Sequence, residues 1–124
     1  MGYRSDVAIA IGNERVQKFK DLLNEHGQAL LNYSDETKFD THTVFFWEDI
    51  KWYDDTYPDV MSVVEAFKGI EEDHKEMVRL GEDWADREDK RYRLKVGGYW
   101  LTYTSPKIVL NGRRIAEYSS WMGE

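Results

Sequence analysis

Carboxylates are concentrated in GEDWADREDK, residues 81–90. Five of them fall within eight residues, namely Glu82, Asp83, Asp86, Glu88 and Asp89. Such oxygen-rich runs can bind a hard cation, but this one lacks the alternating ligand order and central glycine of a calcium loop. Trp84 lies among these charges, and an aromatic residue ringed by charge is favoured at the centre of a protein interface. Two roles stay open for the stretch: a solvated loop, and a contact surface for a basic protein.

The acidic charge extends through the middle of the chain. Residues 48–89 carry 5 basic and 15 acidic side chains (−10), residues 1–47 carry 5 and 7 (−2), and residues 90–124 carry 7 and 2 (+5). A phosphate backbone would be repelled by this middle third, which argues against binding to duplex nucleic acid. Asp54 and Asp55 lie in the same third, and we assign them to the same predicted contact surface as the acidic stretch.

A second candidate site lies in the basic C-terminal third. Arg113 and Arg114 follow the dipeptide Asn111-Gly112, and Trp100 precedes them. Guanidinium groups beside aromatic faces can clamp a phosphate and stack a base, so these residues would suit a nucleotide. The alternative is that positive charge keeps a hairpin soluble and protects its edge.

Motifs for catalysis are missing from the sequence. There is no cysteine, and His26, His42 and His74 stand alone, without the spacing of zinc ligands. The sequence also lacks the nucleophile elbow of serine hydrolases and the glycine-rich loops that bind phosphate. We therefore predict a non-enzymatic protein without a metal site or cofactor.

The length of 124 residues suits one domain, residues 1–124, with one hydrophobic core. No apolar run approaches the roughly 20 residues that cross a bilayer, and MGYRSDVAIAIG lacks the basic start and apolar centre of a signal peptide. We expect a cytoplasmic protein that makes no contact with a membrane.

Hydrophobic periodicity predicts the elements that must position these residues. YRSDVAIAI alternates like a strand, and residues 14–26 show helical spacing before Gly27. We assign QALLNY, residues 28–33, to a short strand rather than to further helical turns, because Gly27 interrupts the pattern. THTVFFWEDIKWY predicts a third strand, the stripe after Pro58 a second helix, and KEMVRLGED a fourth strand.

The resulting order, βαββαβ over residues 3–82, predicts an α+β fold of the ferredoxin-like type. In that fold two helices cover one face of a four-stranded antiparallel sheet. Residues 91–118 are predicted to add two β-hairpins. The first, residues 92–103, turns at Gly97-Gly98, and the second, residues 107–116, turns at Asn111-Gly112.

VFFWEDIKWY is apolar on both parities of the third strand. Val44, Phe46, Ile50 and Trp52 share one parity, whereas Phe45, Trp47 and Tyr53 share the other. A sheet with helices on one face needs only one apolar parity, so the second face must also be covered. We expect at least two of Phe45, Trp47 and Tyr53 to be largely buried there, by the 92–103 hairpin or by another protein chain.

The segments GYRSDVAIAI, FFWEDIKWY, YPDV and VRLGED make residues 2–86 resemble short accessory proteins of tailed phages and prophages. That family carries no known activity, so the resemblance implies no catalytic residue; it implies expression in a bacterial cytoplasm. We therefore expect an inhibitor that binds a basic surface of a host protein complex, foremost one of antiviral defence. The alternatives are an oligomeric module that sequesters a nucleotide signal and a component of the virion or its assembly. A homo-oligomer stays open.

Overall fold

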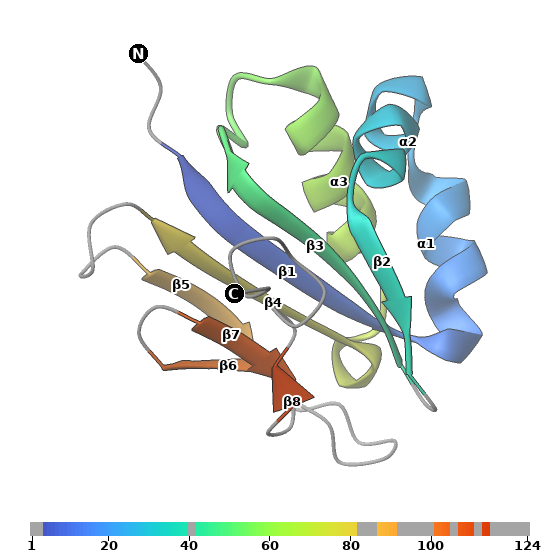
Figure 1. Ribbon diagram of the computed structural model, residues 1–124. Coiled ribbons are helices and arrows are strands. Elements are labelled where there is room, and N and C mark those ends of the chain that lie inside the picture. Colours follow the sequence, from blue (N-terminus) through green and yellow to red (C-terminus); the bar gives the residue numbers. More distant parts are fainter. Residues whose placement is uncertain are drawn as a thin grey trace.

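Two sheets and three helices make up the described part of this computed structural model (Figure 1). It covers residues 4–39, 42–81, 87–91, 101–104, 107–110 and 113–114, with side chains described in the first two ranges. The helices are α1 (Val16–Leu22), α2 (Glu25–Asn32) and α3 (Pro58–Lys68), with short 3-10 turns η1 (Asn13–Arg15) and η2 (Glu72–His74). The strands are β1 (Ser5–Gly12), β2 (Asp35–Lys38), β3 (His42–Ile50), β4 (Lys75–Gly81), β5 (Arg87–Arg91), β6 (Leu101–Thr104), β7 (Lys107–Leu110) and β8 (Arg113–Arg114).

The larger sheet is antiparallel, with the strand order β2-β3-β1-β4-β5. The three helices lie on one face of it, so the fold is α+β as expected (Figure 1). The core lies between this face and the helices, where Val7, Ile9 and Ile11 of β1 pack in the same cluster as Phe19 and Phe67. The alternation in YRSDVAIAI therefore correctly predicted a strand here.

The strand predicted for residues 28–33 is wrong, because these residues belong to a helical region that restarts after a break. The Asn24 side chain caps α2 by accepting a hydrogen bond from the Gly27 N–H at 3.0 Å. Leu30 and Leu31 are the buried leucine side chains of α2. The second strand is instead β2, which follows these residues in the chain, and the described part of the chain contains three helices rather than two.

Gly27 lies inside α2 for a packing reason. A Cβ at this position would overlap the Ser62 side chain of α3 and come within 3.0 Å of Leu23. Glycine therefore allows α2 and α3 to approach closely, and it does not end the first helix. The interpretation of Gly27 as a helix stop was wrong.

The prediction for the second face assigned the wrong parity of β3 to it. Phe45 and Trp47 are buried under the helices: the ring of Phe45 lies 5.7 Å from that of Phe19, and the Trp47 indole N–H donates to the Leu30 carbonyl at 2.9 Å. Val44 and Phe46, on the opposite face, are buried too. Both faces of β3 are thus covered, and it is the helices that cover Phe45 and Trp47.

A β-bulge explains why Ile50 and Trp52 leave the parity of Val44 and Phe46. The register between β1 and β3 shifts between Ser5 and Val7, and Asp49 has a φ of 59°. One extra residue reverses the alternation beyond it. Trp52 consequently joins the core below the helices, with its ring centroid 5.3 Å from that of Trp47.

The smaller sheet has the strand order β6-β7-β8, and β6 contacts β4 of the larger sheet. Leu110 pairs with Arg113 and Val109 with Arg114, which is the strand pairing that a turn at Asn111-Gly112 predicts; residues 111–112 themselves lie outside the described residues. The pairing predicted for the 92–103 hairpin lies outside the described residues. β6 pairs with β7 across residues 105–106, and β5 extends the larger sheet where we predicted a loop.

None of the helices in the described ranges is long and apolar enough to cross a membrane.

Candidate functional site

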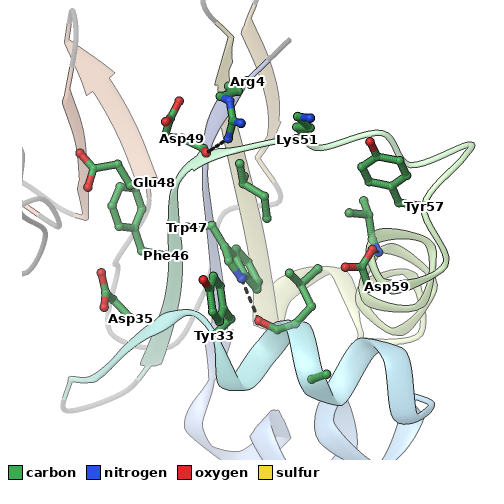
Figure 2. Close-up of a pocket in the computed structure, with 14 residues that line it drawn as sticks. Arg4, Tyr33, Asp35, Phe46, Trp47, Glu48, Asp49, Lys51, Tyr57 and Asp59 are labelled. Carbon is green, nitrogen blue, oxygen red and sulfur yellow. Dashed lines mark hydrogen bonds between the residues drawn. The ribbon is translucent and has the colours of Figure 1, made fainter. Parts of the chain in front are cut away.

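A cavity of about 550 Å³ opens at the end of the larger sheet where β1 begins (Figure 2). Four other element ends meet there: the end of α2, the start of β2, the end of β3 and the start of α3. Its apolar lining comes mainly from Leu30, Trp47, Ile50, Tyr57 and Val60. The cavity therefore has an apolar and aromatic interior formed by segments distant in sequence.

The end of α2 is held over β3 by the hydrogen bond from Trp47 to the Leu30 carbonyl. Tyr33 follows this end as the C-terminal cap of α2, lines the cavity and is 85% exposed. A large aromatic side chain with so much exposed surface is available for contact with a ligand or a protein. Tyr33 was not predicted as a site residue, because residues 28–33 were assigned to a strand.

Negative charge predominates around the cavity. Its lining includes four carboxylates and two basic side chains, namely Asp35, Glu48, Asp49, Asp59, Arg4 and Lys51. Arg4 donates from Nη1 to the Asp49 carbonyl at 3.1 Å, which ties the start of the described chain to the bulge. Asp35 and Asp49 are exposed, and Glu48 and Asp59 are half-buried. This lining suits a positively charged group.

Asp6 lies beside this charge cluster and shows its effect. Burial raises the pKa of the Asp6 carboxyl, and the nearby charge of Asp49 raises it further. The hydrogen bond that Asp6 accepts from the Asp49 N–H, at 2.9 Å, acts in the opposite direction and holds the bulge in place. The carboxylates at this end of the sheet are therefore close enough to interact electrostatically.

Asp54 and Asp55, two of the predicted contact residues, are exposed in the turn between β3 and α3. The turn is fixed by backbone hydrogen bonds from Thr56 and Tyr57 to the Tyr53 carbonyl. Lys51 and Tyr57, which flank the turn, both line the cavity. The turn that carries the predicted pair thus connects two lining residues of the cavity, and Asp54 and Asp55 are not themselves among the lining residues.

The acidic stretch that follows β4 is only partly described. Glu82, Asp83, Trp84 and Asp86 lie outside the described residues. Gly81, which precedes them, pairs with Ser5, and Arg87, which follows them, pairs with Leu80. Both flanking residues thus lie at the cavity end of the sheet. Glu88 belongs to β5, so the solvated loop, one of the two roles left open for this stretch, does not apply to Glu88.

The alternative nucleotide site is not assembled by the described residues. Arg113 and Arg114 form β8 of the smaller sheet, and Trp100 lies outside the described residues. The prediction of a nucleotide clamp therefore stays untested.

The histidines lie apart from the cavity. His42 is fully buried and pairs with Gly12 at the opposite end of β1 and β3. Burial, followed by the charge of His74, lowers the pKa of His42 from 6.5 to about 4, so this imidazole is neutral at physiological pH. His26 is exposed on α2. Among the described residues, no group of three or more acidic, histidine or cysteine side chains is arranged to hold a metal ion.

Sequence signals for the missed site residues existed. Asn24 followed by a polar turn is a typical start of a helix, and that start would have placed Tyr33 at the end of α2. Asp59 after Pro58 is typical of a first helical turn, which favours acidic residues. No local signal marks Arg4 or Asp35, because only the sheet register brings them to the cavity.

Comparisons of the chain with protein-family models, curated proteins and solved structures gave no match.

Proposed function

We propose that this protein is a non-enzymatic binding protein that engages a basic surface of another protein through its acidic end. We define the acidic end as the cavity with its lining carboxylates Asp35, Glu48, Asp49 and Asp59, together with Asp54 and Asp55 of the exposed turn between β3 and α3. The carrying observation is that carboxylates from β2, β3 and α3 meet around an apolar, aromatic cavity. An apolar centre with a charged rim is the usual anatomy of a protein interface.

The acidic rim favours association more than folding. Asp54 and Asp55 are exposed, so their charges add little to stability but attract a basic partner over a Debye length of roughly 8 Å at physiological salt. Tyr33, Tyr57 and the neighbouring apolar groups would then supply the contact area that holds the partner. Binding would act by occlusion, covering the partner's surface without changing it chemically.

We further propose that the partner is a host protein complex, foremost one of antiviral defence, and that binding takes place in the bacterial cytoplasm. The resemblance of residues 2–86 to tailed-phage accessory proteins supports this assignment. The stretch from Glu82 to Asp86, including Asp83 and Trp84, is proposed to extend the same surface, because Gly81 and Arg87 flank it at the cavity end of the sheet.

The fold is proposed to be ferredoxin-like. The strand order β2-β3-β1-β4 and the helical connections from β1 to β2 and from β3 to β4 support this arrangement. β5 and the division of the first helical connection into α1 and α2 would then be additions to it.

A pull-down from bacterial lysate with two charge-reversed variants tests the function. Asp54→Lys/Asp55→Lys changes the acidic end by four charge units. Glu14→Lys/Glu72→Lys changes the net charge equally at exposed positions in η1 and η2, at the opposite end of the sheet. We expect roughly tenfold less captured partner for the first variant and unchanged capture for the second, because electrostatic attraction is local.

Salt dependence provides a second readout. Capture by the unaltered protein should fall as sodium chloride rises from 0.1 to roughly 0.5 M, because exposed charges are screened. Equal capture by both variants would contradict the proposal. Release of a nucleotide from the heated protein, without a protein partner, would favour sequestration, and stoichiometric presence in phage particles would favour a role in the virion.

A further inference from the structure

Part of the cavity lies on the helix-covered face of the larger sheet, between the end of α2 and the start of α3. We call this part the slot and define it by five residues that line the cavity, namely Leu30, Tyr33, Trp47, Tyr57 and Asp59. Figure 2 shows Tyr33 and Trp47 on the α2 side and Tyr57 and Asp59 on the α3 side. The slot therefore has apolar and aromatic walls and a single carboxylate.

Asp59 is the carboxylate that the slot offers to a ligand. It follows Pro58 in the first turn of α3 and is half-buried, and its Oδ1 accepts a hydrogen bond from the Val60 N–H at 2.7 Å. This bond orients the carboxyl group, and a carboxylate has about four acceptor positions, so it can bind further donors. On the other side of the slot, the C-terminal end of α2 carries the negative end of the helix dipole. Both sides of the slot therefore favour a cation.

The other charged residues of the cavity lie outside the slot. Asp35 and Glu48 belong to the opposite face of the sheet. Arg4 is held at the β-bulge by its hydrogen bond to a backbone carbonyl, and Lys51 follows the end of β3 (Figure 2). These two basic side chains would repel a cation from the strand side, so the charged group of a ligand should lie towards Asp59.

An arginine side chain has the chemistry that this slot requires. Its planar guanidinium group binds a carboxylate through two hydrogen bonds, stacks on aromatic rings and is more weakly hydrated than an ammonium group. Tyr33 is 85% exposed and Tyr57 is half-buried, so both can offer ring surface. The apolar stem of an arginine can pack along Leu30 and Trp47. Arginine is also enriched among the residues that contribute most to protein interfaces.

We propose that the slot receives one arginine side chain of the protein partner, whose guanidinium group binds Asp59 and stacks against the tyrosine rings. This inference rests on the proposed function and names the side chain by which the basic partner is anchored. A second copy of this chain is disfavoured as the occupant, because it carries the same net charge of −7 and the same acidic end.

A titration of the ¹⁵N-labelled full chain with three capped tripeptides tests this inference. Each has glycine on both sides of a central residue, which is arginine, its uncharged analogue citrulline, or glutamate. We expect the arginine peptide to bind with a dissociation constant of roughly 1 to 10 mM, because a single side chain has few atoms to contribute. It should shift the indole N–H signal of Trp47 and the amide signals of Tyr33 and Val60.

The two other peptides test the role of charge. Citrulline keeps the shape of arginine but loses its charge, so it should bind roughly fivefold more weakly or worse, and glutamate should not bind. Equal binding of the arginine and citrulline peptides would overturn the inference. Binding of the glutamate peptide, or shifts confined to other parts of the chain, would overturn it too.

Three variants assign the binding to the slot. Asp59→Asn keeps the oxygen that accepts from the Val60 N–H but removes the charge, so it should weaken arginine binding roughly fivefold. Asp54→Asn makes the same change in the exposed turn outside the slot and should alter binding by less than about twofold. Lys51→Gln removes a repelling charge and should tighten binding roughly twofold. Equal weakening by the two aspartate variants, or weaker binding in Lys51→Gln, would contradict the inference.

The pull-down separates the two proposals. Loss of capture in Asp54→Lys/Asp55→Lys without binding of the arginine peptide at the slot would refute the arginine anchor alone. Unchanged capture in that variant would refute the acidic end as the working surface, whatever the peptides show. Loss of both partner capture and arginine binding in Asp59→Asn would support the two proposals together.

Discussion

Trp47 should be one of the most costly side chains to remove, because it joins the cavity to the core. Its side chain is 3% exposed, its ring centroid lies 5.3 Å from that of Trp52, and its indole N–H donates to the Leu30 carbonyl at 2.9 Å. A buried tryptophan removes roughly 200 Å² from water, worth about 4 to 5 kcal/mol at 25 cal/mol per Å². Trp47→Ala should therefore destabilise the fold by about 3 to 5 kcal/mol.

Two further variants divide this loss. Trp47→Phe keeps an aromatic ring but removes the indole hydrogen bond to the Leu30 carbonyl, which still accepts from the Tyr33 N–H at 3.1 Å. The lost hydrogen bond and the lost ring volume should together cost about 1 to 3 kcal/mol. Tyr33→Ala removes an exposed ring and should change stability by less than about 0.5 kcal/mol.

Urea denaturation followed by far-UV circular dichroism measures all three variants without using the altered fluorophore. With a slope of about 1.5 kcal/mol per M, Trp47→Ala should lower the midpoint by roughly 2 to 3 M. A loss below about 1 kcal/mol with cooperative unfolding would refute the burial of Trp47 between β3 and α2.

Three other predictions concern single positions. The fold favours the neutral form of His42, so the unfolded chain binds more protons than the folded chain between pH 6.5 and about 4. The free energy of unfolding should therefore fall by roughly 2 to 3 kcal/mol as the pH falls through this range. His42→Gln should remove that part of the pH dependence of the urea midpoint. Gly27→Ala should lower the stability by about 1 to 3 kcal/mol, and the melting temperature with it, because the added Cβ would overlap Ser62. A higher melting temperature would show instead that the better helix propensity of alanine outweighs the overlap, and it would contradict this reasoning. The φ of 59° at Asp49 penalises a branched side chain, so Asp49→Val should lower the stability by about 1 to 2 kcal/mol and Asp49→Gly by less than about 0.5 kcal/mol. Thermal denaturation measures both variants, and equal losses of stability would contradict this reasoning.

The sequence was sufficient for the elements whose periodicity is long and undisturbed. β1 and α3 were predicted from alternation and from the stripe after Pro58, because burial of one face repeats at the period of the element. The turn at 111–112 was predicted because few dipeptides tolerate positive φ at both central positions. The acidic charge of the middle third was also evident from composition.

The sequence failed where a long-range contact overrides a local signal. Gly27 looks like a helix stop in isolation, and only the approach of Ser62 reveals it as a packing position inside α2. β2 is short and polar, with exposed or half-exposed side chains, so its pairing with β3 decides its conformation and no hydrophobic alternation announces it.

The residues of the candidate site also divide into those that the sequence alone indicates and those that only the tertiary structure brings together. Asp54 and Asp55 were chosen from the sequence because charge density is a local property, and their role in contact stays a prediction. The cavity could not, because Arg4, Tyr33 and Trp47 come from three separate elements that meet only through the register of the sheet and the placement of α2 over β3. The bulge at Asp49 could not be predicted from the sequence either. Its one extra residue reverses the face that each later side chain of the strand occupies. The backbone conformation of Asp49 depends on hydrogen bonds to Asp6 and Arg4, which only the sheet brings close.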